Sequence, residues 1–114
     1  MRQSRQIAWV AVARRGFDDF PEGARRLCLH ALTYLADGDT PAQVKPLKGL
    51  GPGVMEIAAR YRGDAYRVIV DLKSGADLWV LHAFQKKSHR GIKTPVHEIE
   101  LVRRRQRQVR GLHS

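Results

Sequence analysis

The pattern of apolar and polar positions predicts a strand followed by a helix at the start of the chain. Residues 7–13 form a short apolar run between charged positions, and its length suits a buried strand. Asp19 is expected to cap the following helix, with Pro21 in its first turn and an end near Ala36. The helix is indicated by apolar residues that recur at spacings of three and four: Leu27, Ala31, Leu32 and Leu35.

The next segment, residues 40–53, is expected to be a loop because it holds three of the five prolines and three glycines. Its glycines are not followed by a Lys-Ser or Lys-Thr pair, and the segment leads into a predicted strand rather than a helix. It therefore lacks the form of a phosphate-binding loop.

Three strands are expected in the middle of the chain, at residues 54–61, 65–72 and 78–84. The turn signals between them are short, so consecutive strands should pair as an antiparallel meander. A final helix is expected over about residues 94–110, with Thr94 as its cap and Pro95 in the first position.

The element order β-α-β-β-β-α predicts an α+β fold, a small antiparallel sheet with its helices packed on one face. The sequence shows no internal repeat, low-complexity tract or second-domain boundary, so residues 1–114 are expected to form a single domain. The length of 114 residues and the 43% hydrophobic content suit one modest core.

Basic charge is unevenly distributed along the chain. The formal net charge is +10, and residues from 86 onward carry nine bases against two acids. A second basic segment, residues 45–67, has five bases and two acids, while the strand region between them is nearly neutral. Solubility alone predicts interspersed signs, so this asymmetry favours a polyanionic partner, either nucleic acid or an acidic peptide.

Several other classes of protein are excluded or disfavoured by the sequence. The single cysteine, Cys28, excludes an internal disulfide and a cysteine-based zinc site, and its position on the apolar helix face predicts a buried thiol. The five histidines do not form a metal-binding motif, and no cofactor is expected. No apolar run is long enough to span a membrane and no signal peptide is evident, so we expect a cytoplasmic protein without membrane contact.

The candidate chemistry lies in cations of the predicted strands. Arg60 and Arg62 are two residues apart and should share a face, and Arg67, Lys86 and Lys87 lie on or just after neighbouring strands. One interpretation of these residues is a solvated face of the sheet. The functional interpretation is a basic surface that binds a phosphodiester. Arginine and lysine can stabilise charge that develops on phosphorus, and a lysine of lowered pKa can act as a base.

Three segments carry a resemblance to a known family. They are VKPLKGLGPGVMEIAARYRGDAYR at 44–67, LHAFQKKSHRGIKTP at 81–95 and HEIELVRRR at 97–105. The chain resembles, over about residues 6–108, the phage-derived branch of the RelE/HigB toxins, which belong to type II toxin–antitoxin modules. The resemblance implies a RelE-like fold and a metal-free mRNA interferase, which cuts mRNA on the ribosome through the RNA 2′-hydroxyl.

The resemblance also implies roles for individual residues. Arg67, Arg60 and either Lys86 or Lys87 correspond to the family's catalytic cations. Ser88-His89 replaces the tyrosine or histidine that some members carry just after this position, and His89 is a possible acid or base there. His82 is either a core or supporting residue of the last strand or a second possible acid or base. The residues expected to contact RNA are Lys45, Lys48, Arg62, Arg90, Lys93 and Arg105.

The expected partners are the ribosome, mRNA and a helix-turn-helix antitoxin encoded beside the toxin. Two alternatives stay open at the level of sequence: a ParE-like inhibitor of a protein target, which shares the fold without cutting RNA, and a phage-derived protein that only binds nucleic acid. Fold analogy does not separate these functions.

Overall fold

The computed structural model describes residues 4–86 and 94–112, and these form an α+β fold of five strands and three helices. The expected fold class is therefore confirmed. The elements in chain order are β1 (Ile7–Trp9), α1 (Ala11–Asp18), α2 (Glu22–Ala36), β2 (Val44–Pro46), β3 (Val54–Tyr61), β4 (Asp64–Asp71), β5 (Leu78–Lys86) and α3 (Val96–Gly111).

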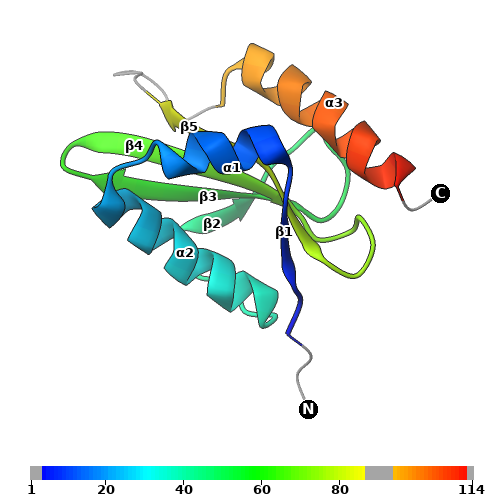
Figure 1. The fold of residues 1–114 in the computed structure, drawn as a ribbon, viewed down its shortest axis with the longest axis horizontal. Helices are drawn as coiled ribbons and strands as arrows, with labels where there is room; N and C mark the ends of the chain where they lie inside the picture. The colour runs from blue at the N-terminus through cyan, green and yellow to red at the C-terminus, as the bar shows by residue number, and fades with distance from the viewer. Residues whose placement is uncertain (1–3, 87–93, 113–114) are drawn as a thin grey trace.

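The strands form one mixed sheet in the order β1-β5-β4-β3-β2 (Figure 1). The predicted antiparallel meander of β3, β4 and β5 is confirmed, and only β1 pairs in parallel, beside β5. The turn from β3 to β4 holds Arg62 at φ 51° and Gly63 at φ 85°. Two consecutive residues of positive φ match the tight hairpin turns whose twist suits antiparallel strands.

The N-terminal prediction was partly wrong. The strand stops at Trp9 and a helix, α1, begins at Ala11, so residues 7–13 do not form one strand. Ala13 and Phe17 are buried four residues apart, and this helical spacing decides the structure after residue 10. Helix α1 lies so close to β5 that a Cβ on Gly16 would meet the carbonyl oxygen of Ala83 at 2.7 Å.

The predicted caps and one predicted stripe position also need correction. Pro21, not Asp19, is the N-cap of α2, and Asp19 instead ends α1. Leu27 is 44% exposed, whereas Cys28 is fully buried as expected. Burial raises the pKa of the Cys28 thiol to about 12, which makes it inert as a nucleophile at neutral pH.

Residues 40–53 are not wholly a loop, since they contain strand β2. Its residues pair with β3, and the backbone N–H of Leu47 donates to the carbonyl of Val54, which closes a β2–β3 hairpin around residues 47–53. The sequence hid this strand because three residues with a proline carry almost no strand signal.

Helices cover both faces of the sheet, contrary to the expectation of one face. Helices α1 and α2 pack on the face that presents Val68 and Val70. Helix α3 packs on the opposite face, with Val102 and Val109 against Ile69 (Figure 1). The alternation of side chains along β4 supplies both cores, because successive residues point to opposite faces.

An irregularity in β5 shapes the face under α3. Ile69 pairs with His82 while Val70 pairs with Val80, so Leu81 is an extra residue in β5. Leu81 and His82 therefore both meet α3 side chains.

In the part of the chain that the structure describes, no helix is long and apolar enough to cross a bilayer.

Candidate functional site

Cations from four strands gather on the sheet face that α3 partly covers. Lys45 of β2 lies directly opposite Glu56 of β3, and Glu56 opposes Ile69, a residue of the core beneath α3. By the alternation along each strand, Arg60 of β3 and Arg67 of β4 share this face. Lys86 of β5 also shares it, since Lys86 and Arg60 flank Ala65 from either side.

Alanines open space between these long side chains. Ala58 pairs with Arg67, and Ala65 lies between Arg60 and Lys86. Around Ala58 and Arg67 the face is hollowed into a groove of about 680 Å³, which we call the basic groove. Its lining residues are Gln43, Lys45, Pro46, Leu47, Lys48, Glu56, Ala58, Arg67, Thr94 and Ile99.

An ion pair between Arg67 and Glu56 forms the floor of the basic groove. Arg67 Nη1 lies 2.6 Å from Glu56 Oε1, and the two side chains are only 12% and 11% exposed. Thr94 Oγ1 donates to the other carboxylate oxygen, Oε2, so Thr94 does not cap α3 as predicted; Pro95 is the N-cap. Arg67 Nε is buried and has no hydrogen-bond partner among the described residues. The ion pair with Glu56 thus leaves one buried N–H bond of the guanidinium unused.

Lys86 lies beside Arg67 and is only 7% exposed. Burial lowers the pKa of its ammonium group, and the charge of Arg67 lowers it further, while Glu56 acts in the opposite direction. A lysine whose pKa moves towards neutrality can accept a proton, which an arginine cannot do.

The buried His82 links α3 to the sheet. Arg105 Nη1 donates to His82 Nδ1 at 3.0 Å and to the carbonyl of Leu81 at 2.9 Å. Because a guanidinium only donates, Nδ1 must accept, and Nε2–H then donates to Glu98 Oε2 at 2.8 Å. Burial lowers the pKa of His82, which keeps the ring neutral. Both ring nitrogens of His82 are therefore engaged within the protein, one by Arg105 and the other by Glu98.

The other site residues predicted from the sequence divide into three groups. Lys45 and Lys48, predicted to contact RNA, and Arg60, predicted to be catalytic, are exposed on or beside the basic groove. Arg62 lies in the turn beyond β3, with its guanidinium 5.2 Å from the ring centre of Tyr61, so it does not continue the face of Arg60. Arg105 is directed inwards towards β5. Lys87, His89, Arg90 and Lys93 lie outside the described residues.

Sequence reasoning gave Glu56, Thr94 and Glu98 no place in the candidate site. Glu56 carried a signal, because it shares strand parity with Arg60 and so must share its face. Thr94 and Glu98 carried none, since their partners are distant in sequence. Among the described residues, no group of three or more histidines, cysteines or carboxylates is placed to hold a metal ion.

Comparisons with known proteins agree with this architecture. The structure of the toxin RelE of E. coli, a free-state variant with two arginines replaced by alanine, superposes with a TM-score of 0.56 at 15% identity. The match covers 72% of this chain and 83% of that one. No curated protein matches the sequence. The family model "Phage derived protein Gp49-like (DUF891)" matches residues 15–107. This chain therefore belongs to the phage-derived Gp49-like family, and its fold is that of RelE.

Proposed function

We propose that this protein is the toxin of a type II toxin–antitoxin module and that it cleaves mRNA in the cytoplasm, on the ribosome, without a metal ion. The observation that carries the proposal is the pair of cations on one sheet face: Arg67, which lines the basic groove, beside Lys86, whose pKa is lowered. The Gp49-like family and the RelE fold support the same function.

The proposed reaction uses the nucleophile that RNA itself provides. Neutral Lys86 takes the proton of the 2′-hydroxyl, and the 2′-oxygen attacks the adjacent phosphorus. The bond from phosphorus to the 5′-oxygen breaks, which leaves a 2′,3′-cyclic phosphate and, after protonation, a 5′-hydroxyl. Arg67 stabilises the negative charge that develops on the phosphoryl oxygens. His89 stays the sequence-based candidate for the proton donor, since His82 has both nitrogens engaged.

The exposed cations around the basic groove have a binding role in this proposal. Lys45, Lys48 and Arg60 neutralise phosphates on either side of the scissile bond. The ion pair of Glu56 with Arg67 orients the guanidinium before substrate arrives. Pre-orientation matters because donors fixed in place need no reorganisation when charge develops.

Mapping of transcript 5′ ends after expression of the protein tests this function. Cuts confined to translated regions, absent from cells that express Arg67→Lys at equal level, are the expected result. Intact transcripts with arrested replication would support the ParE-like alternative instead. RNA binding without any cut would reduce the protein to a nucleic-acid-binding module.

We further propose that a helix-turn-helix antitoxin, encoded beside the toxin, neutralises this protein. The last 29 residues of the chain carry a net charge of +7, which an acidic or mixed-charge segment would complement. Co-purification that survives gel filtration at low salt and weakens at high salt is expected. A neighbouring gene product that never binds would overturn this part of the proposal.

A further inference from the structure

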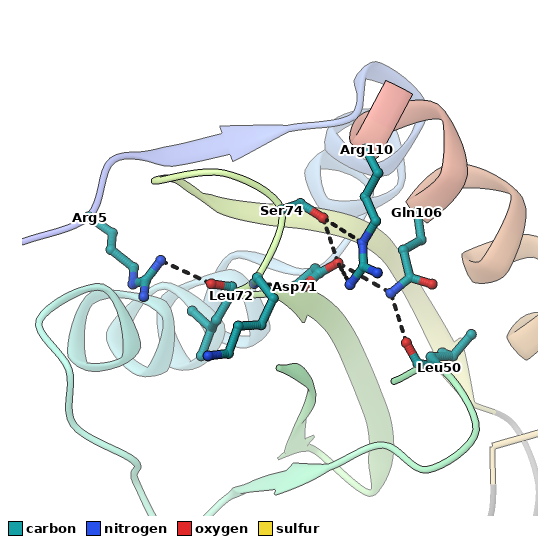
Figure 2. Close-up of polar contacts among 8 residues, drawn as sticks. Arg5, Leu50, Asp71, Leu72, Ser74, Gln106 and Arg110 are labelled. Atoms are coloured by element: carbon teal, nitrogen blue, oxygen red, sulfur yellow. Dashed lines mark hydrogen bonds and ion pairs between the residues drawn. The ribbon is translucent and has the colours of Figure 1, made fainter. Parts of the chain in front are cut away.

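A buried polar cluster lies where the C-terminal half of α3 meets the sheet (Figure 2). Asp71 is fully buried at the end of β4, and Ser74 and Gln106 are 2% and 7% exposed. Burial of polar groups is costly unless each finds a partner, so such a cluster has to be held in one arrangement. None of these residues belongs to the basic groove.

Asp71 is the acceptor at the centre of this cluster. Its carboxylate accepts from the hydroxyl of Ser74 at 2.7 Å, the backbone N–H of Lys73 at 2.8 Å and Arg110 Nη2 at 3.2 Å. Burial alone raises the pKa of Asp71, but these hydrogen bonds and the charge of Arg110 outweigh it, and the net direction is downwards. Asp71 is therefore a fixed anion around neutral pH.

Gln106 connects this anion to a different part of the chain. Its Nε2 donates to the carbonyl of Leu50 at 2.8 Å and to Asp71 Oδ2 at 3.3 Å (Figure 2). A primary amide carries two N–H bonds on one nitrogen, so a single side chain can serve both acceptors. Glutamate at this position has no donor, and leucine leaves the Leu50 carbonyl without this bond.

The carbonyl that Gln106 holds belongs to the 47–53 loop of the β2–β3 hairpin. Leu50 is 4% exposed and packs in the same core as Val102 and Val109 of α3. Arg103 Nη1 adds a contact to the carbonyl of Gly49 at 3.2 Å. The start of this loop, Leu47 and Lys48, lines the basic groove. Helix α3 thus fixes one wall of a groove that Gln106 itself does not touch.

We propose that Gln106 is a positioning residue that fixes Lys48 for contact with the RNA backbone. The inference rests on the proposed function for its RNA readout. The anchoring of the loop by Gln106 does not depend on that function, and it can be measured on the protein alone. The two parts can therefore fail separately.

Amide hydrogen exchange tests the anchoring. Gln106→Leu should raise exchange of the 47–53 amides by about tenfold or more, because exchange follows the free energy of local opening, while the central amides of β4 and β5 stay protected. Gln108 is exposed on the same helix, so Gln108→Leu makes the same chemical change at a site without the bridge. Equal exchange of the loop in both variants would overturn the anchoring.

A double-mutant cycle tests the positioning. The readout is affinity for an RNA oligonucleotide that carries 2′-O-methyl groups and so cannot be cut. Lys48→Ala should weaken binding of the otherwise unchanged protein by about tenfold but of the Gln106→Leu variant by less than about threefold, since coupled residues are not additive. In the Gln108→Leu background, Lys48→Ala should again weaken RNA binding by the full tenfold.

The outcomes separate the two proposals. Additive losses, or a Lys48→Ala variant that binds as tightly as the unchanged protein, would overturn the positioning role while RNA binding stands. If the unchanged protein binds neither the oligonucleotide nor programmed ribosomes, the proposed function fails, and the exchange experiment still decides whether Gln106 anchors the loop.

Discussion

Arg67 of β4 and Glu56 of β3 are diagonal neighbours across the sheet, and Arg67 Nη1 lies 2.6 Å from Glu56 Oε1. Both side chains are almost buried, so the pair has lost most of its contact with water. Removal of one member leaves an uncompensated charge, which is more costly than the net worth of the pair. Glu56 therefore serves both the stability of the sheet and the orientation of Arg67.

Glu56→Ala is expected to lower the free energy of unfolding by about 3 kcal/mol, because it leaves Arg67 buried without its anion. Urea denaturation measures this. Glu22→Ala is the matched control: Glu22 pairs with Arg26, but the side chains are 75% and 76% exposed. Glu22→Ala should lower the free energy of unfolding by less than about 0.5 kcal/mol. Equal losses for the two variants would show that burial of the Arg67 pair has no energetic consequence.

Lys86→Arg is expected to lower the cleavage rate on the order of 10²–10³-fold while RNA affinity changes little, because arginine keeps the charge but cannot act as a base. Burial and Arg67 lower the pKa of Lys86, so the rate of the unchanged protein should rise with pH and level off below pH 10.5, the ordinary lysine value. Single-turnover rates across pH measure both effects. Lys45→Arg, an exposed substitution of the same kind, is the control and should keep the pH profile.

Arg60 and Arg105 should differ in the salt dependence of RNA binding. Arg60→Ala removes an exposed cation beside the groove, so the slope of log K against log salt should fall in magnitude by about 1. Arg105→Ala removes inward contacts to Leu81 and His82, so the slope should persist while the thermal midpoint falls. A reduced slope for Arg105→Ala would place that side chain on RNA.

His82 should make the protein less stable in mild acid. Its pKa is lowered by burial in the folded state, so the unfolded chain binds more protons near pH 6.5. The stabilisation that neutral His82 contributes is complete above the pKa that this histidine has in the unfolded chain. It is lost as the pH falls from there towards the lower pKa of His82 in the folded protein. Thermal midpoints from pH 7.5 to 5.5 should drop for the unchanged protein, and less steeply for His82→Phe.

The sequence was sufficient for those parts of the fold that local patterns determine. The strands predicted at 54–61 and 65–72 correspond to β3 and β4, and the short turn signal between them correctly predicted their antiparallel pairing. Residues 7–13 misled because a short apolar run does not distinguish a strand from a strand followed by a helix. Strand β2 was missed because long-range pairing with β3, rather than its own propensity, forms it.

Residues of the candidate site were predictable only where strand parity or the family resemblance indicated them. Arg60, Arg67 and Lys86 were named from the sequence and do share a face, but Arg62 was assigned to the face of Arg60 by strand parity although it lies in the turn after Tyr61, where the alternation no longer applies. The role of His82 depends on Glu98 and Arg105, which come from a helix packed across the sheet. Such contacts between distant segments have no local signal.

Single-turnover cleavage on ribosomes programmed with mRNA, comparing the unchanged protein with Arg67→Lys, is the most direct test that the basic groove is an RNA-cutting site. The lysine keeps the charge opposite Glu56 and so keeps the fold, but it loses the planar fork of donors. We expect the cleavage rate to fall on the order of 10²-fold, with an unchanged thermal midpoint and unchanged ribosome binding. Cleavage at the wild-type rate by Arg67→Lys, or no cleavage by the unchanged protein, would show that the groove does not perform this chemistry.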